Sequence, residues 1–442
     1  MIIMPKLTFI GAGSTVFAKN VIGDCFLVPE LNGLEVALYD IDPVRLDDSY
    51  RMISNLNEKY KANAKITATL DRAEALKGAK YIVNAIQVGG YDPCTITDFE
   101  IPKKYGLRQT IADTLGIGGI FRALRTIPVM FDIAEDIKKY AHKDALFINY
   151  TNPMAMLSGA MQRYTDVPTV GLCHSVQGCA SGLLNELGFG DMVKNMKWKI
   201  AGINHQAWLY EITDLDGNDL YPMLKERAND DAYIREHCGW DLVRLDIMKK
   251  FGYYVTESSE HNSEYMPYFI KDKYPELIER YNIPLDEYPR RCVNQIEGWN
   301  KMREDLTNNK DLEHNRTGEF ASYIINAMET DIPYRIHGNV LNTGLITNLP
   351  SEACVEVPCM IDRNGVNPCY VGALPEQCAA MNRTNINVQL LAIKAAVTKK
   401  KDYIYQAAMM DPHTAAELSI DDIRAMCDDL IVAHKGWLPE YN

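Results

Sequence analysis

The stretch Lys6-Leu7-Thr8-Phe9-Ile10-Gly11-Ala12-Gly13-Ser14, near the amino terminus, decides the fold. Its apolar and β-forming residues before Gly11 predict a strand, and the apolar spacing over residues 14–27 predicts a helix. A glycine turn between them lets backbone N–H groups meet a pyrophosphate at the helix N-terminus, where the helix dipole favours negative charge. We therefore expect a dinucleotide-binding turn made by Gly11, Ala12, Gly13 and Ser14.

Acidic residues after the second predicted strand favour the same interpretation. Asp40 and Asp42 follow residues 34–39, at a position where a carboxylate accepts hydrogen bonds from an adenosine ribose. A carboxylate there favours NAD over NADP. The motif is truncated, because Val16 stands where a full dinucleotide fingerprint carries a third glycine. Two glycines in such a turn also serve backbone geometry alone, so this alternative stays open.

Length and composition place the chain among globular proteins with a large core. Its 442 residues, 47% of them hydrophobic, predict two domains or one core with a second lobe. The formal net charge of −13 repels the phosphates of nucleic acids and anionic membranes, so neither is expected as a partner. The sequence has no apolar run of about 18 residues and no signal-peptide pattern at Met1-Ile2-Ile3-Met4-Pro5, so we expect a cytoplasmic protein. The 11 cysteines, without a CxxC pair, indicate reduced and mostly buried thiols.

The order of the predicted elements gives the fold class. Strands and helices alternate to about residue 190, and the apolar runs at 81–86 and 146–150 are typical of buried parallel strands. Beyond Lys199 the alternation is lost, and long polar helices are predicted at 288–306 and 384–396. We predict an α/β protein in which residues 1–195 form an NAD-binding, Rossmann-like, doubly wound parallel sheet. Residues 196–442 are predicted to form an α+β lobe for substrate, metal and oligomer contacts.

Several polar residues follow the predicted strands, at the edge where doubly wound folds bind ligands. They are Gln87, Gly89, Asn152, Cys173 and His174. Asn152 also suits the cap of a helix begun by the following proline. Cys173 and His205 are candidate metal ligands, because a thiolate and an imidazole suit a borderline divalent ion and leave coordination positions for substrate oxygens. Taken singly, a buried cysteine and a hydrogen-bonded histidine are more often structural.

Three further candidates each have a structural alternative. Asp113 is either an acidic site residue or a helix cap ahead of Gly118. Tyr265 is either a site residue or an aromatic at an interface, and Arg291 is either a ligand for substrate or a surface cation on a helix. The residues alone indicate an NAD-linked α/β enzyme, of which a dehydrogenase is one example.

Taken together, the motifs resemble glycoside hydrolase family 4 nearly from end to end. The segments that carry the resemblance follow in the order of the family, at residues 11–14, 87–91, 113–119, 152–154, 173–176 and 202–205. Within the family, the sequence Cys-His-Ser-Val at 173–176 and the segments 255–261, 285–289 and 407–413 are most similar to the bacterial α-galactosidases.

The resemblance implies a redox-assisted elimination, which is an exception to hydrolysis by paired carboxylates. NAD⁺ takes a hydride from C3 of the sugar, and the resulting ketone acidifies the C2 proton. A base removes that proton, the C1–O bond breaks, water adds to the enone, and the hydride returns. No net oxidation of the sugar results.

The same resemblance implies a role for each candidate residue. Cys173 and His205 would hold Mn²⁺ or another divalent ion, and Tyr265 would be the C2 base, ionised by nearby positive charge. Asp113 would be the acid for the leaving oxygen, which requires a pKa raised by burial. The sugar would be bound by Asn152, His174 and Arg291, and NAD by residues 11–14, Asp40, Gln87 and Gly89.

The sugar and the wider class keep alternatives. The Cys-His-Ser-Val sequence favours an unphosphorylated α-galactoside, while a galacturonide is an alternative because Arg122 or Arg125 would pair with a C6 carboxylate. Through the resemblance to the family, an α-glucoside and a 6-phospho-α-glycoside are further alternatives for the substrate. An NAD-dependent hydroxy-acid dehydrogenase and a dinucleotide-binding regulator share the predicted sheet. The apolar and aromatic second lobe predicts a homodimer or homotetramer.

Overall fold

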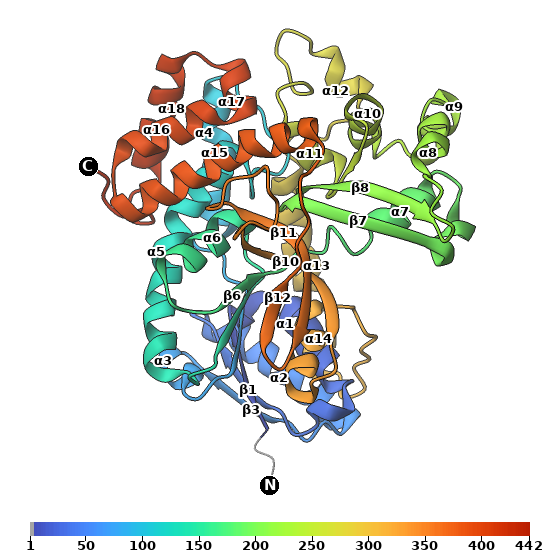
Figure 1. The fold of residues 1–442 in the computed structure, drawn as a ribbon. Coiled ribbons are helices and arrows are strands. Elements are labelled where there is room, and N and C mark those ends of the chain that lie inside the picture. Colours follow the sequence, from blue (N-terminus) through green and yellow to red (C-terminus); the bar gives the residue numbers. More distant parts are fainter. Residues whose placement is uncertain (1–3) are drawn as a thin grey trace.

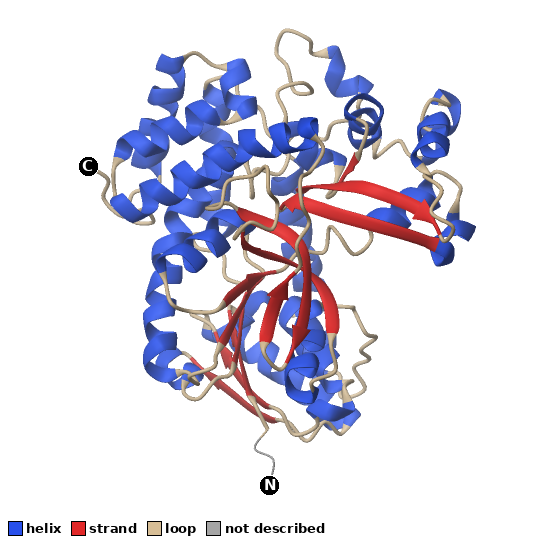
Figure 2. Ribbon diagram, in the orientation of Figure 1, coloured by secondary structure: helices blue, strands red, loops and turns tan. Residues whose placement is uncertain are grey.

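The strand, glycine turn and helix predicted at the amino terminus are present. β1 (Lys6–Ile10) leads through Gly11 and a 3-10 turn (Ala12–Ser14) into α1 (Val16–Phe26). The computed structural model describes residues 4–442. Figure 1 shows the amino-terminal strands and helices at one end of the molecule and the carboxyl-terminal helices at the other. Figure 2 shows the strands running through the middle with helices on both sides.

The amino-terminal strands form the predicted parallel sheet. Its order is β3-β2-β1-β4-β5-β6, and every neighbouring pair is parallel. The strand order reverses between β1 and β4, so the turn after β1 and the loop after β4 meet at the carboxyl edge of the sheet. The bounds of the other strands are β2 (Glu35–Tyr39), β3 (Lys65–Thr69), β4 (Tyr81–Asn84), β5 (Leu146–Asn149) and β6 (Thr169–Gly171).

Helices connect these parallel strands, as the alternating pattern predicted. Asp42 caps α2 (Pro43–Tyr60) by accepting the N–H groups of Val44 and Arg45, so its carboxylate is used locally. The longest of these helices begins at Gly116 and ends at Tyr140. These helices are α2 (Pro43–Tyr60), α3 (Arg72–Leu76), α4 (Ile96–Lys104), α5 (Gly116–Tyr140), α6 (Met154–Tyr164) and α7 (Cys179–Glu186).

The carboxyl-terminal half extends the same sheet with antiparallel strands. β10 pairs with β6 and β11 with β7, so the order continues β6-β10-β11-β7-β8-β9, and β12 pairs with β11. One sheet therefore contains strands from both sides of residue 195. The division into domains 1–195 and 196–442 stays a prediction. These strands are β7 (Met196–Ile203), β8 (Gln206–Asp214), β9 (Tyr254–Val255), β10 (Tyr334–Leu341), β11 (Cys354–Asp362) and β12 (Gly365–Pro368).

The helices of this half confirm the predicted mixture of α and β elements. The segments predicted at 288–306 and 384–396 lie inside longer helices, α13 and α15. In Figure 1 the last four helices gather beside α5 and α6. The helices are α8 (Tyr221–Arg227), α9 (Asp231–His237), α10 (Leu242–Phe251), α11 (Ser259–Tyr265), α12 (Glu276–Arg280), α13 (Glu287–Asn308), α14 (Phe320–Thr330), α15 (Glu376–Thr398), α16 (Lys401–Met410), α17 (Pro412–Glu417) and α18 (Ile420–Ala433).

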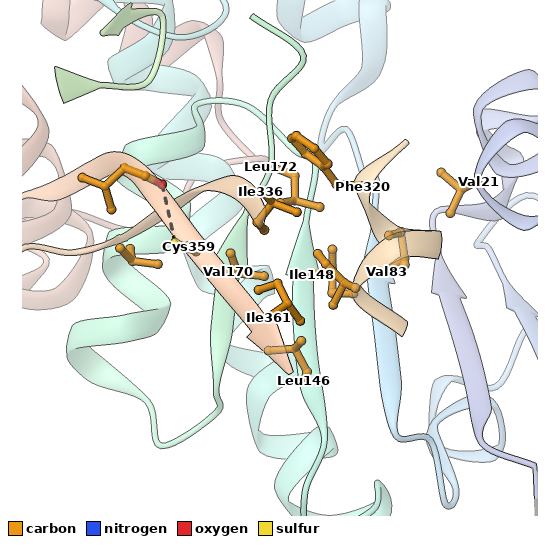
Figure 3. Close-up of a cluster of buried hydrophobic side chains, with 14 of the residues drawn as sticks. Val21, Val83, Leu146, Ile148, Val170, Leu172, Phe320, Ile336, Cys359 and Ile361 are labelled. Atoms are coloured by element: carbon orange, nitrogen blue, oxygen red, sulfur yellow. Dashed lines mark hydrogen bonds between the residues drawn. The ribbon is translucent and has the colours of Figure 1, made fainter. Parts of the chain in front are cut away.

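One hydrophobic core joins the two halves of the sheet. Figure 3 shows Val83 and Ile148 of the parallel strands near Phe320 of α14, Ile336 of β10 and Ile361 of β11. All five side chains are buried, and such burial contributes about 1.5–3 kcal/mol for each large aliphatic or aromatic side chain. The strands that carry the candidate site are therefore packed on one another rather than linked by loops alone.

Two expectations from composition can be compared with the described residues. All 11 cysteines are free, and all but Cys173 and Cys369 are buried. None of the helices in residues 4–442 is both long and apolar enough to cross a membrane.

Candidate active site

The turn after β1 requires glycine at two positions. Gly11 has a φ of 85°, and a Cβ there would lie 2.6 Å from the carbonyl oxygen of Ala85 after β4. A Cβ on Gly13 would lie 2.7 Å from Asp40 Oδ2. The chain therefore passes close to both neighbouring strands, which brings the N-terminus of α1 to the carboxyl edge of the sheet.

The residues around this turn fit a dinucleotide. Asp40 accepts the N–H of Gly13 at 2.6 Å and that of Asp42 at 2.9 Å, so its carboxylate is fixed beside the turn at the end of β2. Ser14 Oγ is buried and has no hydrogen-bond partner in the described residues. A buried hydroxyl without a partner, next to a helix N-terminus, is suited to a phosphate oxygen.

The loop after β4 carries the other predicted cofactor residues. Gln87 is exposed and donates from Nε2 to Thr95 Oγ1 at 3.3 Å. Gly89 is buried with a φ of 81°, and a Cβ at this position would collide with Cys94. The structure places both residues at the same sheet edge as the glycine turn, because β4 is the neighbour of β1.

Cys173 and His205 lie together, as predicted, with a third donor between them. Cys173 follows β6, His205 forms the tight turn between β7 and β8, and Glu257 follows β9. One ligand atom from each lies within 4.8 Å of the other two. His205 and Glu257 have φ values of 64° and 67°, a left-handed conformation that is unusual for these residues and often occurs at functional sites.

The charges around His205 suit a cation. Burial alone would lower the pKa of His205, but Glu257 and Cys173 outweigh it and raise this pKa to about 10. His205 Nε2 lies 3.5 Å from Glu257 Oε2. A thiolate, an imidazole and a carboxylate form a donor set used for divalent transition metals, so these residues fit the predicted metal ion.

Tyr265 contacts the same imidazole from the other side. Its hydroxyl lies 3.1 Å from His205 Nδ1, and its side chain is fully buried. Burial, together with the carboxylates of Asp113 and Glu264, raises the pKa of Tyr265 well above its ordinary value. A base role for this phenol therefore requires a cation beside it, and the donors around His205 are placed to hold one.

Asp113 lies in the site but does not have the predicted raised pKa. Burial raises the pKa of Asp113, but Arg122, His261 and His205 together lower it below its ordinary value. Its Oδ1 accepts the Thr114 hydroxyl at 2.7 Å. The capping alternative does not apply, because α5 begins after Leu115 without a side-chain cap.

Glu264 fixes the loop of Asp113 against the helix that carries Tyr265. Its carboxylate accepts the backbone N–H groups of Thr110 at 2.8 Å, Ile111 at 3.2 Å and Ala112 at 2.8 Å. Since Glu264 and Tyr265 are neighbours in α11, the loop and the phenol are held as one unit. Hydrogen bonds to a buried carboxylate are stronger than those between neutral groups.

The three predicted sugar-binding residues lie in different surroundings. Asn152 donates from Nδ2 to Asp113 Oδ2 at 3.3 Å, and it does not cap α6. The exposed His174 contacts Glu319 at 2.7 Å through Nε2. Arg291 pairs with Glu260 at 2.8 Å and Glu287 at 3.0 Å, so two carboxylates occupy its guanidinium. The structure brings Asn152 to the centre of the site, while a sugar-binding role for Arg291 stays a prediction.

Two site residues were not singled out from the sequence. Glu257 and His261 come from the charged run before Tyr265. His261 Nε2 lies 3.9 Å from Asp113 Oδ1, and its ring packs edge-on against that of His205 at 4.9 Å. His261 and Tyr265 are four residues apart in α11, a spacing that places them on one face of the helix, while Glu257 lies before its N-terminus.

The two arginines considered as partners of a C6 carboxylate differ in whether another side chain already binds their guanidinium group. Arg125 is fully buried and binds Asp98 through two hydrogen bonds, at 3.1 and 2.6 Å, so it is not free to bind a sugar. Arg122 lies 3.4 Å from the Tyr288 hydroxyl and is the cation that acts most strongly on Asp113.

Comparison with known proteins gives a consistent result. Residues 6–189 match the sequence profile described as family 4 glycosyl hydrolase, and residues 200–414 match its C-terminal domain. The α-galactosidase of Bacillus subtilis strain 168 is 62% identical over 438 residues, which cover 99% of this chain and 100% of that protein. The crystal structure of lplD from Bacillus subtilis has a TM-score of 0.85 at 25% identity and covers 97% of this chain and 99% of its own. A 6-phospho-α-glucosidase from gut microorganisms, solved with NAD and Mn²⁺, shares the fold with a TM-score of 0.77 at 20% identity, covering 100% of both chains.

Proposed function

Because this chain belongs to family 4 of the glycosyl hydrolases, we propose that it is an α-galactosidase that works with NAD⁺ and a divalent metal ion such as Mn²⁺. The 62% identity to an α-galactosidase over the full length supports the galactoside. The engagement of Arg125 by Asp98 removes one of the two cations considered for a galacturonide.

One arrangement carries the proposal. Cys173, His205 and Glu257 converge on one point, and His205 also contacts Tyr265, so a metal site and a candidate base share one imidazole. The glycine turn and the loop after β4 lie at the same edge of the sheet as Cys173, which supports a dinucleotide and a metal ion acting on one substrate.

Some of the residues would hold NAD⁺ and the metal ion, and others would act on the sugar. The turn at residues 11–14 and Asp40 would hold NAD⁺, and Cys173, His205 and Glu257 would hold the metal. When bound, these groups supply reversible hydride acceptance and Lewis acidity toward neighbouring sugar oxygens. Tyr265 removes the proton from C2 of the sugar, and Asn152 binds its hydroxyls.

Asp113 receives a different role from the one the resemblance implies. Arg122 and His261 hold the pKa of Asp113 below its ordinary value, which does not favour donation of a proton to the leaving oxygen. Asp113 Oδ2 accepts a hydrogen bond from Asn152 Nδ2 at 3.3 Å, so we assign to Asp113 the orientation of Asn152 toward the sugar.

Two properties of the whole protein belong to the same proposal. A cytoplasmic enzyme has NAD⁺ and reducing conditions available, and the free Cys173 thiol needs the latter to remain a ligand. A homodimer or homotetramer is the proposed assembly.

The test is the hydrolysis of p-nitrophenyl α-galactoside by the full chain with NAD⁺, Mn²⁺ and a thiol reductant, omitting each in turn. The proposal predicts release of p-nitrophenol only with all three, without net formation of NADH. Release that is independent of NAD⁺ and Mn²⁺ would contradict the proposed mechanism. NADH formed in proportion to product would indicate a dehydrogenase instead.

A further inference from the structure

Four residues are paired one after another across β6, β10, β11 and β7. They are Gly171, Asn339, Glu356 and Gly202, and we call them the line. β10 and β11 pair Asn339 with Glu356. In the described residues, the register joins β6 to β10 at Gly171 and Asn339 alone, and β11 to β7 at Glu356 and Gly202 alone. One residue pair joins β6 to β10, and one residue pair joins β11 to β7. Both pairs belong to this line, so the two halves of the sheet are continuous through it.

The two polar side chains of the line are buried and bonded to each other. Asn339 and Glu356 are both 0% exposed. Asn339 Nδ2 donates to Glu356 Oε1 at 3.2 Å and to the carbonyl oxygen of Gly171 at 3.3 Å. A buried amide and carboxyl in a sheet otherwise rich in Val, Ile and Cys cost free energy unless they are hydrogen-bonded. Asn339 Oδ1 and Glu356 Oε2 are also buried without a hydrogen-bond partner in the described residues, so the pair is unfavourable as core packing and indicates another function at this junction.

Neither glycine at the ends of the line has space for a Cβ atom. A Cβ on Gly171 would lie 2.5 Å from Met154 Sδ and 3.0 Å from Asn339 Cβ. A Cβ on Gly202, whose φ is 153°, would lie 2.8 Å from Ala207 Cα. Both outer strands are therefore in close contact with their neighbours where the line crosses them.

The ligand candidates lie immediately beyond these ends. Cys173 is two residues past Gly171, and His205 is three residues past Gly202. β6 and β7 run in opposite directions with β10 and β11 between them. Ligand atoms of Cys173 and His205 nevertheless lie within 4.8 Å of each other, so the segments that follow β6 and β7 turn toward each other across β10 and β11. The Asn339–Glu356 pair joins the two strands that these segments cross.

We propose that Asn339 and Glu356 are positioning residues that set the separation of Cys173 and His205 for metal binding. This inference rests on the proposed metal site and adds to it two side chains that keep Cys173 and His205 at the separation needed to bind the ion. Asn339 acts through its hydrogen bonds to Glu356 and to the backbone of Gly171, and neither residue needs to contact the ion.

The test measures Mn²⁺ affinity of the full chain by titration calorimetry, independently of catalysis. Removing residues that orient metal ligands weakens metal affinity by roughly 10–100-fold, which is the loss expected for Asn339→Ala and Glu356→Ala. Glu356→Gln keeps an oxygen that accepts from Asn339 Nδ2, so its affinity should stay near that of the unmodified chain. With Co²⁺ in place of Mn²⁺, the thiolate charge-transfer absorption reports the bond to Cys173 directly, and it should weaken in the two Ala variants only.

A matched control separates positioning from general loss of stability. Val357→Ala removes volume from the same strand at a buried position whose side chain lies on the opposite face of the sheet from Glu356. It should lower the melting temperature and leave Mn²⁺ affinity unchanged. If Glu356→Ala does not fold, Asn339→Ala carries the test, because it leaves the carboxyl in place.

The outcomes are distinct. Unchanged Mn²⁺ affinity in folded Asn339→Ala would overturn the inference, and so would a loss in Glu356→Gln as large as in Glu356→Ala, because charge would then be the cause. An unmodified, folded chain that binds no Mn²⁺ would overturn the proposed metal site and this inference together. Binding by the unmodified chain with no effect in the Ala variants would overturn the inference alone.

Discussion

His205 Nδ1 lies 3.1 Å from the hydroxyl of Tyr265, while Nε2 of the same ring faces Glu257 at 3.5 Å. A histidine that binds a metal through one nitrogen usually has its other nitrogen fixed by a hydrogen bond, which orients the ring. Here that second contact is the proposed C2 base. The phenol and the metal ligands are therefore placed relative to each other by a single side chain.

The first prediction concerns the hydroxyl of Tyr265. Tyr265→Phe keeps the buried ring and removes the proposed base, so kcat should fall by roughly 10²–10⁴-fold, the usual contribution of acid–base catalysis. Tyr405→Phe is the control, because it removes a phenol that contacts Asp428 in the carboxyl-terminal helices. The control should retain full activity in steady-state assays. A Tyr265→Phe enzyme with normal kcat would reject the assignment.

The second prediction concerns Glu257, the donor that sequence reasoning missed. Glu257→Gln should weaken Mn²⁺ binding by at least about tenfold, because it replaces an anionic ligand with a neutral amide. Glu211→Gln, which changes an exposed partner of Lys199 on β8, should bind Mn²⁺ normally. Calorimetric titration of both variants provides the measurement. Equal affinity in the two would exclude Glu257 from the metal site.

The third prediction separates two roles for Asp113. If Asp113 orients Asn152, Asp113→Asn should slow the hydrolysis of galactosides with good and poor leaving groups by the same factor. A general acid matters mainly for poor leaving groups, so a loss confined to them would restore the acid role. Comparing kcat/KM for a dinitrophenyl galactoside and a disaccharide makes the distinction.

A fourth prediction concerns stability rather than chemistry. Asp24 of α1 is fully buried and accepts hydrogen bonds from His314 Nε2 at 2.8 Å and from the Thr317 hydroxyl at 2.7 Å. Burial raises the pKa of Asp24, but these bonds lower it below its ordinary value. Asp24→Asn should reduce the free energy of unfolding by on the order of 3 kcal/mol at neutral pH.

The sign of the pH dependence follows from the lowered pKa of Asp24. A carboxyl whose pKa is lower in the folded state stabilises fully above its unfolded value of about 3.9, and this stabilisation is lost as the pH falls through the folded pKa. The difference in unfolding free energy between the unmodified chain and Asp24→Asn should therefore shrink in acid. Asp166→Asn, which changes an almost fully exposed side chain, should have the unfolding free energy of the unmodified chain both at neutral pH and in acid. A difference for Asp24→Asn that is constant with pH would contradict the role given to its charge.

Much of the amino-terminal half was predictable, because its pattern is local. The apolar run at 81–86 became β4, that at 146–150 became β5, and the glycine turn took the predicted form. The continuation of the sheet through β10 and β11 was not predictable. These strands follow β6 by more than 160 residues, and nothing in their own sequence states which edge they will join.

The site was predictable where residues follow strands and unpredictable where they depend on neighbours. Cys173 and His205 were chosen for the metal-binding chemistry of a thiolate and an imidazole and through the family resemblance, and their ligand atoms do lie together. The raised pKa expected for Asp113 was wrong, because it depended on Arg122 and His261, which come from other segments. The pairing of Arg291 with Glu260 and Glu287 likewise depends on the contact between α11 and α13.

The measurement that tests the central claim most directly is the hydrolysis of an α-galactoside in deuterated water, followed by NMR of the released galactose. In the proposed elimination across C1 and C2, a base assigned to Tyr265 removes the C2 proton, and the solvent then supplies its replacement. Deuterium at C2 of the product is therefore expected. Galactose released with its original C2 hydrogen would contradict the proposed elimination and would return the reaction to direct displacement at C1.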